Sequence, residues 1–584
     1  MAEVRAEVVQ GFDSEGNYHD VIYDDLLKNN PPEGIEIHPL CRKLIDTPEF
    51  QRLKDIKQLD QLNLMFEKAK HTRYEHCIGT SILCGWFFDE LVTHSKQAIN
   101  MNEEEKKKYR MCVVVAGLLH DIGHCVLGHS YPKYVKNCTK LEPTEHETMG
   151  ILIIKRLLKR NDIWNAFCEN GLNEDADAKE NHQLSYIDYI YMMIAGKKKL
   201  LPKEMESLWD AVPNNRKWLL QIVSNDKNGI DMDRIDYLLR DSHYTDLKTS
   251  VNYQRIITNA YICEYQGETT ICFDRDVIYD LISVFQSRMT FYLHACCHRH
   301  NQIAEHMILD ALQIAEKNGF GFQVVKPSRF VTDNNLILSL ALGILKEKMK
   351  PDEYSRIETI MNEYKKTDRL KEGCETVMKK QKETDPLKTG CVPLSSAWRN
   401  LDFYLQATDH ILNQLKESTE KEYSESRLLL NRVERKDFYT CVGEINVNSY
   451  YINKTARGGK KMINGRYYYD REQTTDYVKG QVEEIIKDEK GTIIPDDLII
   501  DCSLVSHGQG ERNPFESILF WDGSSKVKHY DGFMMSNVFS TEYEDVLVRF
   551  YSRTKENDDY WKSIFKTWRM KHHAYNVAYQ SMEE

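Results

Sequence analysis

The densest group of residues able to do chemistry is the segment LLHDIGHCVLGH, which holds His120, Asp121, His124 and His129. A lone histidine in an apolar stretch is more often a hydrogen-bonded core residue than a ligand. Three histidines within ten residues are more than packing requires. His120 and Asp121 end an apolar helical run, and adjacent residues can face one ion only where a helix ends or kinks. The segment therefore predicts a metal site at a helix end.

Two distant segments offer further ligands, although each alone is weak. His76 lies in HTRYEHCIG, and Asp233 lies in NGIDMDRIDYLLRD, where carboxylates recur at positions 231, 233 and 236. A mixed set of imidazoles and carboxylates suits Mn, Fe, Zn or Mg and does not choose among them. We expect His76, His120, Asp121 and Asp233 to hold one divalent ion, with open positions for water or a phosphate oxygen.

A different motif competes for the same residues, because His120, Asp121 and His124 also spell H-D-x-x-H, close to the H-E-x-x-H of zinc proteases. That motif needs both histidines on one helix face. Gly123 interrupts such a helix, and no third-ligand motif follows. We therefore favour a phosphate-directed metal centre over a protease site.

The charge balance argues against nucleic acid as a primary partner. The 584 residues include 78 Lys and Arg against 90 Asp and Glu, a formal net charge of −12, so the mean field repels polyanions. A pocket lined with arginines can still bind a small phosphate compound, because local geometry outweighs the mean field within a Debye length. Charge alone leaves the substrate open.

Cysteine usage and the N-terminus indicate the compartment. The 15 cysteines are scattered and form no Cys-x-x-Cys pair, which fits a reducing environment. The N-terminus lacks the apolar stretch of a signal peptide, and the apolar run at 111–119 is too short to cross a bilayer. We expect a cytoplasmic or nuclear protein that is neither secreted nor associated with membrane.

The elements that must position these residues are mostly helical. Asp46 or Thr47 followed by Pro48 is a helix start, and Phe50, Leu53 and Ile56 then recur at helical spacing. Further helical patterns cover 78–92, 109–120, 145–158, 230–239 and 277–316. The first half is therefore predicted to be predominantly α.

Changes in composition divide the chain. We predict a helical core over 20–330, a charged insertion over 331–397 and a return to the core over 398–445. Segments rich in β-branched residues such as DLIIDCSLV then predict a mixed α/β lobe over 446–584, with a helical pattern at 560–579. The expected fold class is mainly α with a smaller C-terminal α+β lobe.

Four blocks resemble the HD-domain deoxynucleoside triphosphate triphosphohydrolases, in particular the animal branch that also carries a sterile-alpha-motif domain. Weaker similarity continues over 279–311 and from about 400 onward, so most of the chain outside the insertion is covered. The core begins close to the N-terminus, so we expect no sterile-alpha-motif domain. The resemblance implies that 20–330 is an HD-type catalytic core. The blocks are IEIHPLCRKLIDTPEFQRLKDIKQL, HTRYEHCIG, AGLLHDIGHCVLGH and VSNDKNGIDMDRIDYLLRDSHY.

The resemblance implies a reaction and roles for individual residues. Water attacks the α-phosphorus of a dNTP, releasing a deoxynucleoside and intact inorganic triphosphate. Fe, Mn or Zn would occupy the HD site, with Mg accompanying the nucleotide, and His129 or His146 would protonate the departing 5′-oxygen. The matching positions are His76, His120, Asp121 and Asp233 for the metal; His124, His129, His146 and Glu147 for catalysis; Arg73, Arg234 and Arg288 for the triphosphate, Arg234 in place of a lysine; Gln58, Tyr237 and Asp241 for the sugar 3′-hydroxyl; and Leu59 against the sugar.

Three substitutions in the sugar pocket keep alternatives open. Tyr292, Cys296 and Cys297 stand where the family has a histidine, a tyrosine and a glutamine. One alternative is an HD-type phosphohydrolase acting on another nucleotide or a phosphomonoester. Another is a nucleotide-sensing scaffold with little turnover, against which the complete set of four metal ligands argues.

The family is activated by nucleotides bound between subunits, which implies guanine-nucleotide and dNTP activators and a homo-oligomer, dimer or tetramer. Several positions differ from the family pattern, and Lys cannot reproduce the bidentate fork of Arg. We therefore expect activation to be altered, relaxed or absent. The corresponding positions are Asp46 and Gln51, which match; Lys54, which replaces an arginine; Phe66, Arg255 and His298, which persist; and Arg299, which replaces a lysine.

Overall fold

A computed structural model of the chain contains two compact units. The first contains Met1–His124, Glu145–Met307 and Arg432–Glu584, and the second contains Cys125–Thr144 and Ile308–Asn431. Within them the structure describes residues 6–12, 18–24, 26, 35–95, 100–179, 182–323, 391–448, 461–463, 466–468, 471–488, 496–508, 513–521, 527–529 and 544–572.

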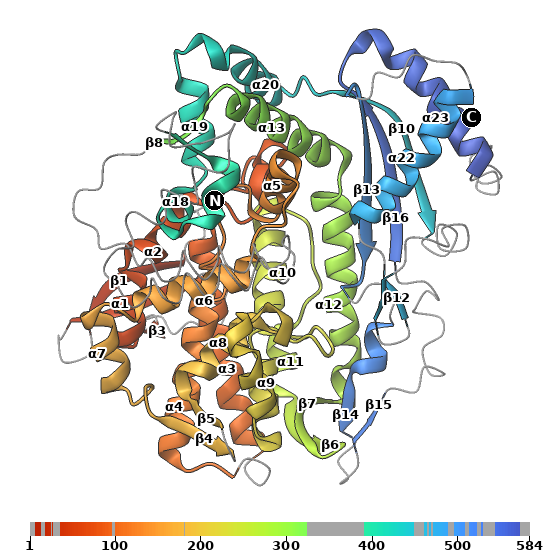
Figure 1. The fold of residues 1–584 in the computed structure, drawn as a ribbon. Helices are drawn as coiled ribbons and strands as arrows, with labels where there is room; N and C mark the ends of the chain where they lie inside the picture. Colours follow the sequence, from red (N-terminus) through yellow and green to blue (C-terminus); the bar gives the residue numbers. More distant parts are fainter. Residues whose placement is uncertain are drawn as a thin grey trace, which may run out of the picture. The chain divides into compact units, whose positions relative to one another are not determined.

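The first unit has a helical core, as the sequence predicts. Helix α3 packs against α4 and α10, while α8 packs against α4 and α6 (Figure 1). The helices are α1 (Pro39–Ile45), α2 (Pro48–Gln51), α3 (Arg73–His94), α4 (Glu103–Leu119), α6 (His146–Leu157), α7 (Asn161–Glu169), α8 (Tyr186–Ala195), α9 (Glu206–Ala211), α10 (Met232–Thr245), α11 (Tyr253–Thr258), α12 (Ile278–Phe291) and α13 (Arg299–Lys317), which continues into the second unit.

Short 3-10 turns and one π-helical turn connect these helices. The 3-10 turns are Arg52–Asp55, Asp60–Leu64, Lys198–Leu200, Lys203–Met205, Asn214–Gln221 and Arg275–Val277, and the π-helical turn is Tyr292–Cys296.

Local sequence explains where the central helices begin. Thr72 and Glu75 form a capping box at the start of α3, and Asn102 and Glu105 form another at the start of α4. The Asp231 side chain accepts the Arg234 N–H at the start of α10. These caps fix the ends of the three helices that carry the predicted metal ligands.

Two predicted helices are shorter than their periodicity suggested. Thr47 caps α2 as expected, but α2 ends at Gln51 and a 3-10 turn follows, with Arg52 Nη2 donating to the Ile122 carbonyl at 2.5 Å. The pattern over 277–316 is two helices, because the π-helical turn, closed by a bond from Cys297 N to Tyr292 O at 2.7 Å, separates α12 from α13. Periodicity could not show either break, since the apolar spacing continues across both.

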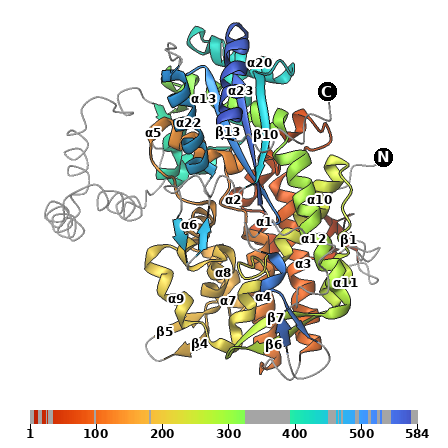
Figure 2. The same ribbon diagram turned by 90° about the vertical axis from the view of Figure 1, so that its right-hand side faces the viewer.

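Strands in the first unit lie outside the helical core. An N-terminal sheet contains β1 (Ala6–Phe12), β2 (Tyr18–Asp24) and β3 (Ile35–Glu36), and β4 (Asp175–Lys179) pairs with β5 (His182–Ser185). A four-stranded sheet has the order β15-β14-β7-β6, in which β14 runs parallel to β7. Figure 1 labels its four strands, and Figure 2 shows β6 and β7 from the side. Its strands are β6 (Ala260–Tyr265), β7 (Glu268–Asp274), β14 (Leu519–Trp521) and β15 (Val527–His529).

The C-terminal part is the mixed lobe that composition predicts. An antiparallel sheet of order β10-β16-β13 carries helices α22 and α23 against it, and Phe550, Trp561 and Trp568 fill the interface (Figure 1). The elements are β10 (Thr440–Asn448), β11 (Lys461–Ile463), β12 (Arg466–Tyr468), α22 (Arg471–Asp488), β13 (Leu498–Ser506), β16 (Glu544–Ser552), α23 (Asp558–His572) and the 3-10 turns Pro514–Ser517 and Lys555–Asn557. Of the pattern predicted at 560–579, residues 573–579 lie outside the described residues.

The second unit is also largely helical. Glu316 joins its segments by accepting hydrogen bonds from Tyr134 Oη at 2.7 Å and from the Ser395 N–H at 2.9 Å. Residues 331–390 of the predicted insertion lie outside the described residues, and the predicted domain boundaries stay predictions. The elements are a 3-10 turn (Gly128–Ser130), α5 (Tyr131–Thr139), β8 (Gly321–Gln323), β9 (Cys391–Pro393), a 3-10 turn (Leu394–Arg399), α18 (Leu401–Gln406), α19 (His410–Glu417), a 3-10 turn (Lys421–Tyr423) and α20 (Ser424–Glu434).

Among the described residues of both units, no helix combines the length and apolarity needed to cross a membrane.

Candidate active site

The four predicted metal ligands converge in the first unit from three helices. His76 Nε2, on α3, lies 3.1 Å from His120 Nε2, at the end of α4, and 3.1 Å from Asp233 Oδ1, on α10. The same Asp233 oxygen lies 3.6 Å from His120 Nε2. The Asp121 carboxylate lies 3.9 Å from His76 Nε2 and 3.6 Å from His120 Nε2. Two imidazoles and two carboxylates therefore face one point.

The end of α4 explains how adjacent residues share this point. His120 is the residue after the last helical position, Leu119, and a turn closed by the His124 N–H on the Asp121 carbonyl follows at 3.0 Å. The chain leaves the helical path there, so the His120 and Asp121 side chains need not diverge by the roughly 100° that separates consecutive residues of a helix.

Buried partners hold the outer nitrogens of both imidazoles. His76 Nδ1 lies 2.7 Å from Asp236 Oδ2, and His120 Nδ1 lies 2.8 Å from the Gly117 carbonyl. Arg240 in turn binds Asp236 at 2.8 Å and Asp24 at 2.7 Å, with all three side chains at most 1% exposed. Anchoring the outer nitrogen aims the other nitrogen at a metal. The sequence prediction noted the carboxylate at 236 but missed Arg240, four residues later on the same helix face.

Gly79 makes room for the buried side chains of Arg240 and Asp236. A Cβ atom at Gly79 on α3 would lie 2.1 Å from both Arg240 Nη2 and Asp236 Oδ1. The Arg240–Asp236 pair therefore occupies the space of a missing side chain.

The electrostatics of the four ligands favour a cation. Burial opposes charge on His76, but Asp233 and Asp236 raise its pKa to about 10. Burial likewise opposes charge on Asp233, yet His120 and His76 lower its pKa. Burial also opposes charge on His120, but Asp121 and Asp233 raise its pKa. A field that holds protons on imidazoles this strongly also attracts a divalent ion, which competes for the same nitrogens. The residues present therefore fit a bound divalent metal.

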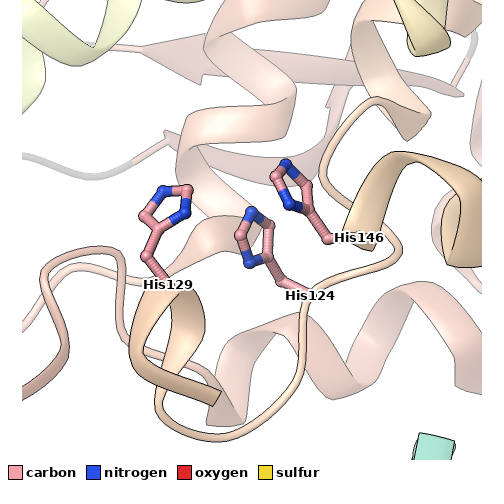
Figure 3. A group of neighbouring side chains, drawn as sticks. All are labelled: His124, His129 and His146. Atoms are coloured by element: carbon pink, nitrogen blue, oxygen red, sulfur yellow. The ribbon is translucent and has the colours of Figure 1, made fainter. Parts of the chain in front are cut away.

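His124 and His146 form a second group beside Asp121. Their rings stack with centroids 3.9 Å apart (Figure 3), and His124 Nε2 lies 3.3 Å from Asp121 Oδ1. Burial, Arg73 and His146 lower the pKa of His124 well below its usual value. Glu147 lies 3.4 Å from His146 Nδ1, and burial raises its pKa to about 7. His124 is thus a neutral imidazole near pH 7.

Gly123 allows that stacking. A Cβ atom there would lie 1.9 Å from the His146 carbonyl oxygen and 2.4 Å from Gly150 N, both on the backbone of α6. The chain carrying His124 therefore packs directly on α6. His129 belongs to the second unit, in the 3-10 turn Gly128–Ser130, where it is exposed, and its role stays a prediction.

The three predicted phosphate-binding arginines lie in the first unit. Arg73 Nη1 donates to Asp121 Oδ2 at 2.5 Å, while its buried Nε and Nη2 have no hydrogen-bond partner among the described residues. Arg234 Nε and Nη1 are likewise buried and unmatched within the described part of the chain. The Arg288 guanidinium lies over the Tyr292 ring, with its central carbon 3.9 Å from the ring centroid. Buried donors without partners are costly unless an anion meets them.

Two of the polar residues predicted to contact the sugar, Gln58 and Asp241, both contact His71. Gln58 N donates to the His71 carbonyl at 3.0 Å, and Gln58 Oε1 is buried without a hydrogen-bond partner among the described residues. Asp241 Oδ1 lies 2.7 Å from His71 Nε2, whose ring stacks on Tyr244 at 4.3 Å. His71 was not predicted, although it opens the HTRYEHCIG segment.

Three of the residues predicted near the sugar pack against one apolar cluster. Leu59, Tyr292 and Cys296 pack against a buried cluster of Leu62, Phe291 and Ala295. Cys297 belongs to a different cluster, with Val505 and Leu547 of the C-terminal lobe. The structure thus separates the two cysteines that the sequence places side by side.

The predicted activator residues already contact other groups. Asp46 pairs with Arg42 at 2.8 Å, and Gln51 Nε2 donates to the Ile45 carbonyl at 2.7 Å. Their roles stay predictions. Of the others, Lys54 lies over the Tyr74 ring at 4.6 Å, Phe66 packs on the Leu62 cluster, Arg255 pairs with Asp280 at 3.1 Å, the His298 ring lies 5.2 Å from that of His300, and the Arg299 carbonyl accepts from Tyr551 Oη at 3.2 Å.

Comparison with known proteins agrees with this geometry. Residues 73–241 match the family model of the HD domain. The matched segment contains His76, His120, Asp121 and Asp233, the four residues whose side chains converge in the helical core.

The chain also resembles particular proteins over most of its length. It is 26% identical to the deoxynucleoside triphosphate triphosphohydrolase SAMHD1 of Xenopus laevis over 90% of this chain and 71% of that protein. For the Homo sapiens protein of the same name the identity is 25%, over 91% and 71%. The SAMHD1 homolog of Dictyostelium discoideum is 29% identical over 62% and 63%. The resemblance expected from the four sequence blocks is thus confirmed.

Proposed function

We propose that this protein is a metal-dependent dNTP triphosphohydrolase that releases a deoxynucleoside and inorganic triphosphate. The observation that carries the proposal is the convergence of His76, His120 and Asp233, whose ligand atoms all lie within 4.8 Å of one another. Asp121 lies beside them and binds Arg73, an arginine with unmatched donors. The similarity to proteins named deoxynucleoside triphosphate triphosphohydrolase supports the substrate.

The metal ligands in this proposal are His76, His120, Asp121 and Asp233, with Fe, Mn or Zn as the ion and Mg accompanying the nucleotide. A divalent ion there supplies Lewis acidity toward water and phosphate oxygens. Arg73, Arg234 and Arg288 bind the triphosphate and offset its charge. The buried Nε and Nη2 of Arg73 and the buried Nε and Nη1 of Arg234 have no hydrogen-bond partner among the described residues. These donors can therefore bind phosphate oxygens without first breaking an ion pair.

We assign proton transfer to His146, with His129 as the other predicted donor. Glu147 lies 3.4 Å from His146 Nδ1, so it can hold that nitrogen while the other ring nitrogen serves the 5′-oxygen. The lowered pKa of His124 instead suits a neutral hydrogen-bonding group.

Selection of the sugar in this proposal depends on polar residues that bind the 3′-hydroxyl and on apolar residues that pack beside the sugar. Gln58, Tyr237 and Asp241 contact the 3′-hydroxyl, with Asp241 held by His71. Leu59, Tyr292 and Cys296 pack on the apolar cluster of Leu62, Phe291 and Ala295, and none of these six side chains carries a charge near neutral pH. An apolar wall of this kind supports a preference for deoxyribose of at most about 100-fold.

Regulation and assembly belong to the proposal as well. Guanine-nucleotide and dNTP activators, a homodimer or homotetramer, and a cytoplasmic or nuclear location follow from the family resemblance. The pairing of Asp46 with Arg42 and of Arg255 with Asp280 supports altered activation, because an activator would have to displace both partners.

Replacing Asp121 by Asn tests the site. The change removes a ligand charge at nearly constant volume, and we expect turnover of dNTPs with a divalent metal to fall at least about 1000-fold, as for loss of an essential catalytic group. A melting curve and metal analysis of the same variant separate loss of folding from loss of the ion. Full activity of Asp121→Asn would contradict the proposal.

A further inference from the structure

A tight turn after strand β13, residues 506–508, contacts two of the arginines assigned to the triphosphate. Ser506 is the last residue of β13, and its carbonyl accepts a hydrogen bond from Arg288 Nη1 at 2.6 Å. Gly508 has φ +95°, in the left-handed region, and its N–H donates to Ser506 Oγ at 3.2 Å. The backbone of the turn therefore reaches the Arg288 guanidinium directly.

The turn leaves no room for a side chain on its arginine side. A Cβ atom at Gly508 would lie 2.6 Å from Arg234 Nη1 and 3.0 Å from Arg288 Nε and Cδ. All of these atoms belong to flexible side chains, so a methyl group there would displace the guanidinium groups while the main chain stays in place. Gly508 is thus required for the position of the arginines as well as for its own φ.

The two arginines differ in how they are otherwise held. Arg288 also lies over the ring of Tyr292, with its guanidinium carbon 3.9 Å from the ring centroid. Arg234 has buried Nε and Nη1 atoms without a hydrogen-bond partner among the described residues, and Nη1 is the atom nearest the Gly508 Cβ position. Contact with the turn therefore limits where the unmatched donors of Arg234 can point.

We propose that the 506–508 turn is a positioning element for the triphosphate group: it fixes Arg234 and Arg288 so that both guanidinium groups meet one polyanion. The C-terminal lobe thereby completes a site whose other residues come from the helical core. The inference rests on the proposed function in one respect, the assignment of both arginines to a triphosphate, and neither Ser506 nor Gly508 was among the predicted site residues.

The test is the affinity of the metal-loaded full chain for inorganic triphosphate, measured by calorimetry, in Gly508→Ala. Displacing the charged donors removes charge-assisted hydrogen bonds, so the dissociation constant is expected to rise at least about tenfold. The KM for a dNTP should rise by a similar factor, while kcat changes less and the bound metal is unchanged. A purely structural role would lower the melting temperature without this split between KM and kcat.

Gly319→Ala is the matched control. Gly319 has φ +93°, and no atom lies within 4 Å of its Cβ position, so alanine there carries the same backbone strain without meeting an arginine. Its triphosphate affinity is expected to equal that of the wild type. Ser506→Ala removes the acceptor of the Gly508 N–H without adding bulk, and it should weaken triphosphate binding by a smaller factor. If Gly508→Ala does not fold, the affinity of Ser506→Ala is the test of the inference.

Wild-type affinity in both Gly508→Ala and Ser506→Ala would overturn the inference, as would equal weakening in Gly319→Ala or a wild-type protein that does not bind triphosphate. Failure of the proposed function is distinct: a wild-type protein that binds triphosphate but hydrolyses no dNTP would refute the function and leave the role of the turn in place.

Discussion

The residue that does most to set the geometry of the metal ligands is Asp236, which is not itself a predicted ligand. It lies between His76 Nδ1, at 2.7 Å, and Arg240, at 2.8 Å, and Arg240 continues to Asp24 of strand β2. Despite burial, Arg240 and His76 lower the pKa of Asp236, so it stays ionised. A carboxylate on the outer nitrogen fixes the tautomer of the imidazole and raises its basicity toward a metal.

Asp236→Asn should therefore weaken metal binding without removing a ligand. The amide lacks the charge that raises the basicity of His76, and loss of such an outer partner typically costs about 10–100-fold in metal affinity. Titration of chelator-stripped protein with Zn²⁺ or Mn²⁺ in a calorimeter gives the dissociation constant directly.

Asp226→Asn provides the control for that experiment. Asp226 pairs with Lys197 at the surface, with both side chains more than 40% exposed, so its neutralisation changes the net charge by the same amount without removing the carboxylate that contacts His76. We expect unchanged metal affinity. Equal affinity of Asp236→Asn and wild type would show that the buried carboxylate does not act on His76.

The raised pKa of Glu147 predicts that the stability of the protein depends on pH. The Glu147 carboxyl group has a pKa raised by burial from 4.5 to about 7, so the folded state binds a proton more tightly than the unfolded state. The stabilisation is complete below about pH 4.5 and is lost as the pH rises through about 7. The full span is on the order of 3 kcal/mol. Glu147→Gln should lose less stability than wild type between pH 5 and pH 8, as measured by melting temperature, and parallel pH profiles would contradict this.

At the scale of elements, the contact between the end of α4 and the start of α6 decides where His124 lies. Gly123 packs on the backbone of α6 at His146 and Gly150, with no space for a side chain. Only a backbone in contact with a backbone brings the His124 and His146 rings to 3.9 Å. The same glycine was the reason for rejecting a continuous helix at the sequence level.

Gly123→Ala should therefore destabilise the protein and separate the two rings. The added methyl group meets main-chain atoms that cannot move independently of α6, and such overpacking costs about 1–3 kcal/mol or more. A lower melting temperature and reduced turnover are expected.

Gly480→Ala is the matched comparison for that variant. Gly480 lies in α22, is exposed and has no atom within 4 Å of its Cβ position, so alanine there should stabilise the helix by about 0.5–1 kcal/mol. Differential scanning calorimetry of both variants should shift the melting temperatures in opposite directions. A stabilised Gly123→Ala would refute the close packing of α4 on α6.

Sequence alone was sufficient for the helical core because its helices have strong apolar periodicity and clear caps, such as the Thr72 and Glu75 pair. It was insufficient at the break between α12 and α13, where the pattern continues through Tyr292–Cys296 while the hydrogen bonds change register. Types and spacing also indicated His76, His120, Asp121 and Asp233, because few residue types bind metals. The outer contacts of Asp24, Arg240 and Gly508 depend on positions far apart in the chain, which a linear pattern does not contain.

At the scale of the whole molecule, the first unit combines a helical core with a C-terminal lobe. This lobe contributes strands to the four-stranded sheet β15-β14-β7-β6 and residues to the candidate site. Strand β14 pairs in parallel with β7, and the Ser506 carbonyl at the end of β13 binds Arg288 of α12. The lobe therefore meets the helical core at Arg288, one of the arginines that we propose to bind the triphosphate. On that proposal, variants at the end of β13 should change substrate affinity.

The most direct test of the central claim is the identity of the products. Purified protein with a divalent metal and a single dNTP in H₂¹⁸O is analysed by ion-exchange chromatography and mass spectrometry. We expect equal amounts of deoxynucleoside and unbroken triphosphate, with the label in the triphosphate because water attacks the α-phosphorus. Release of pyrophosphate or single phosphate, or label in the nucleoside, would contradict it.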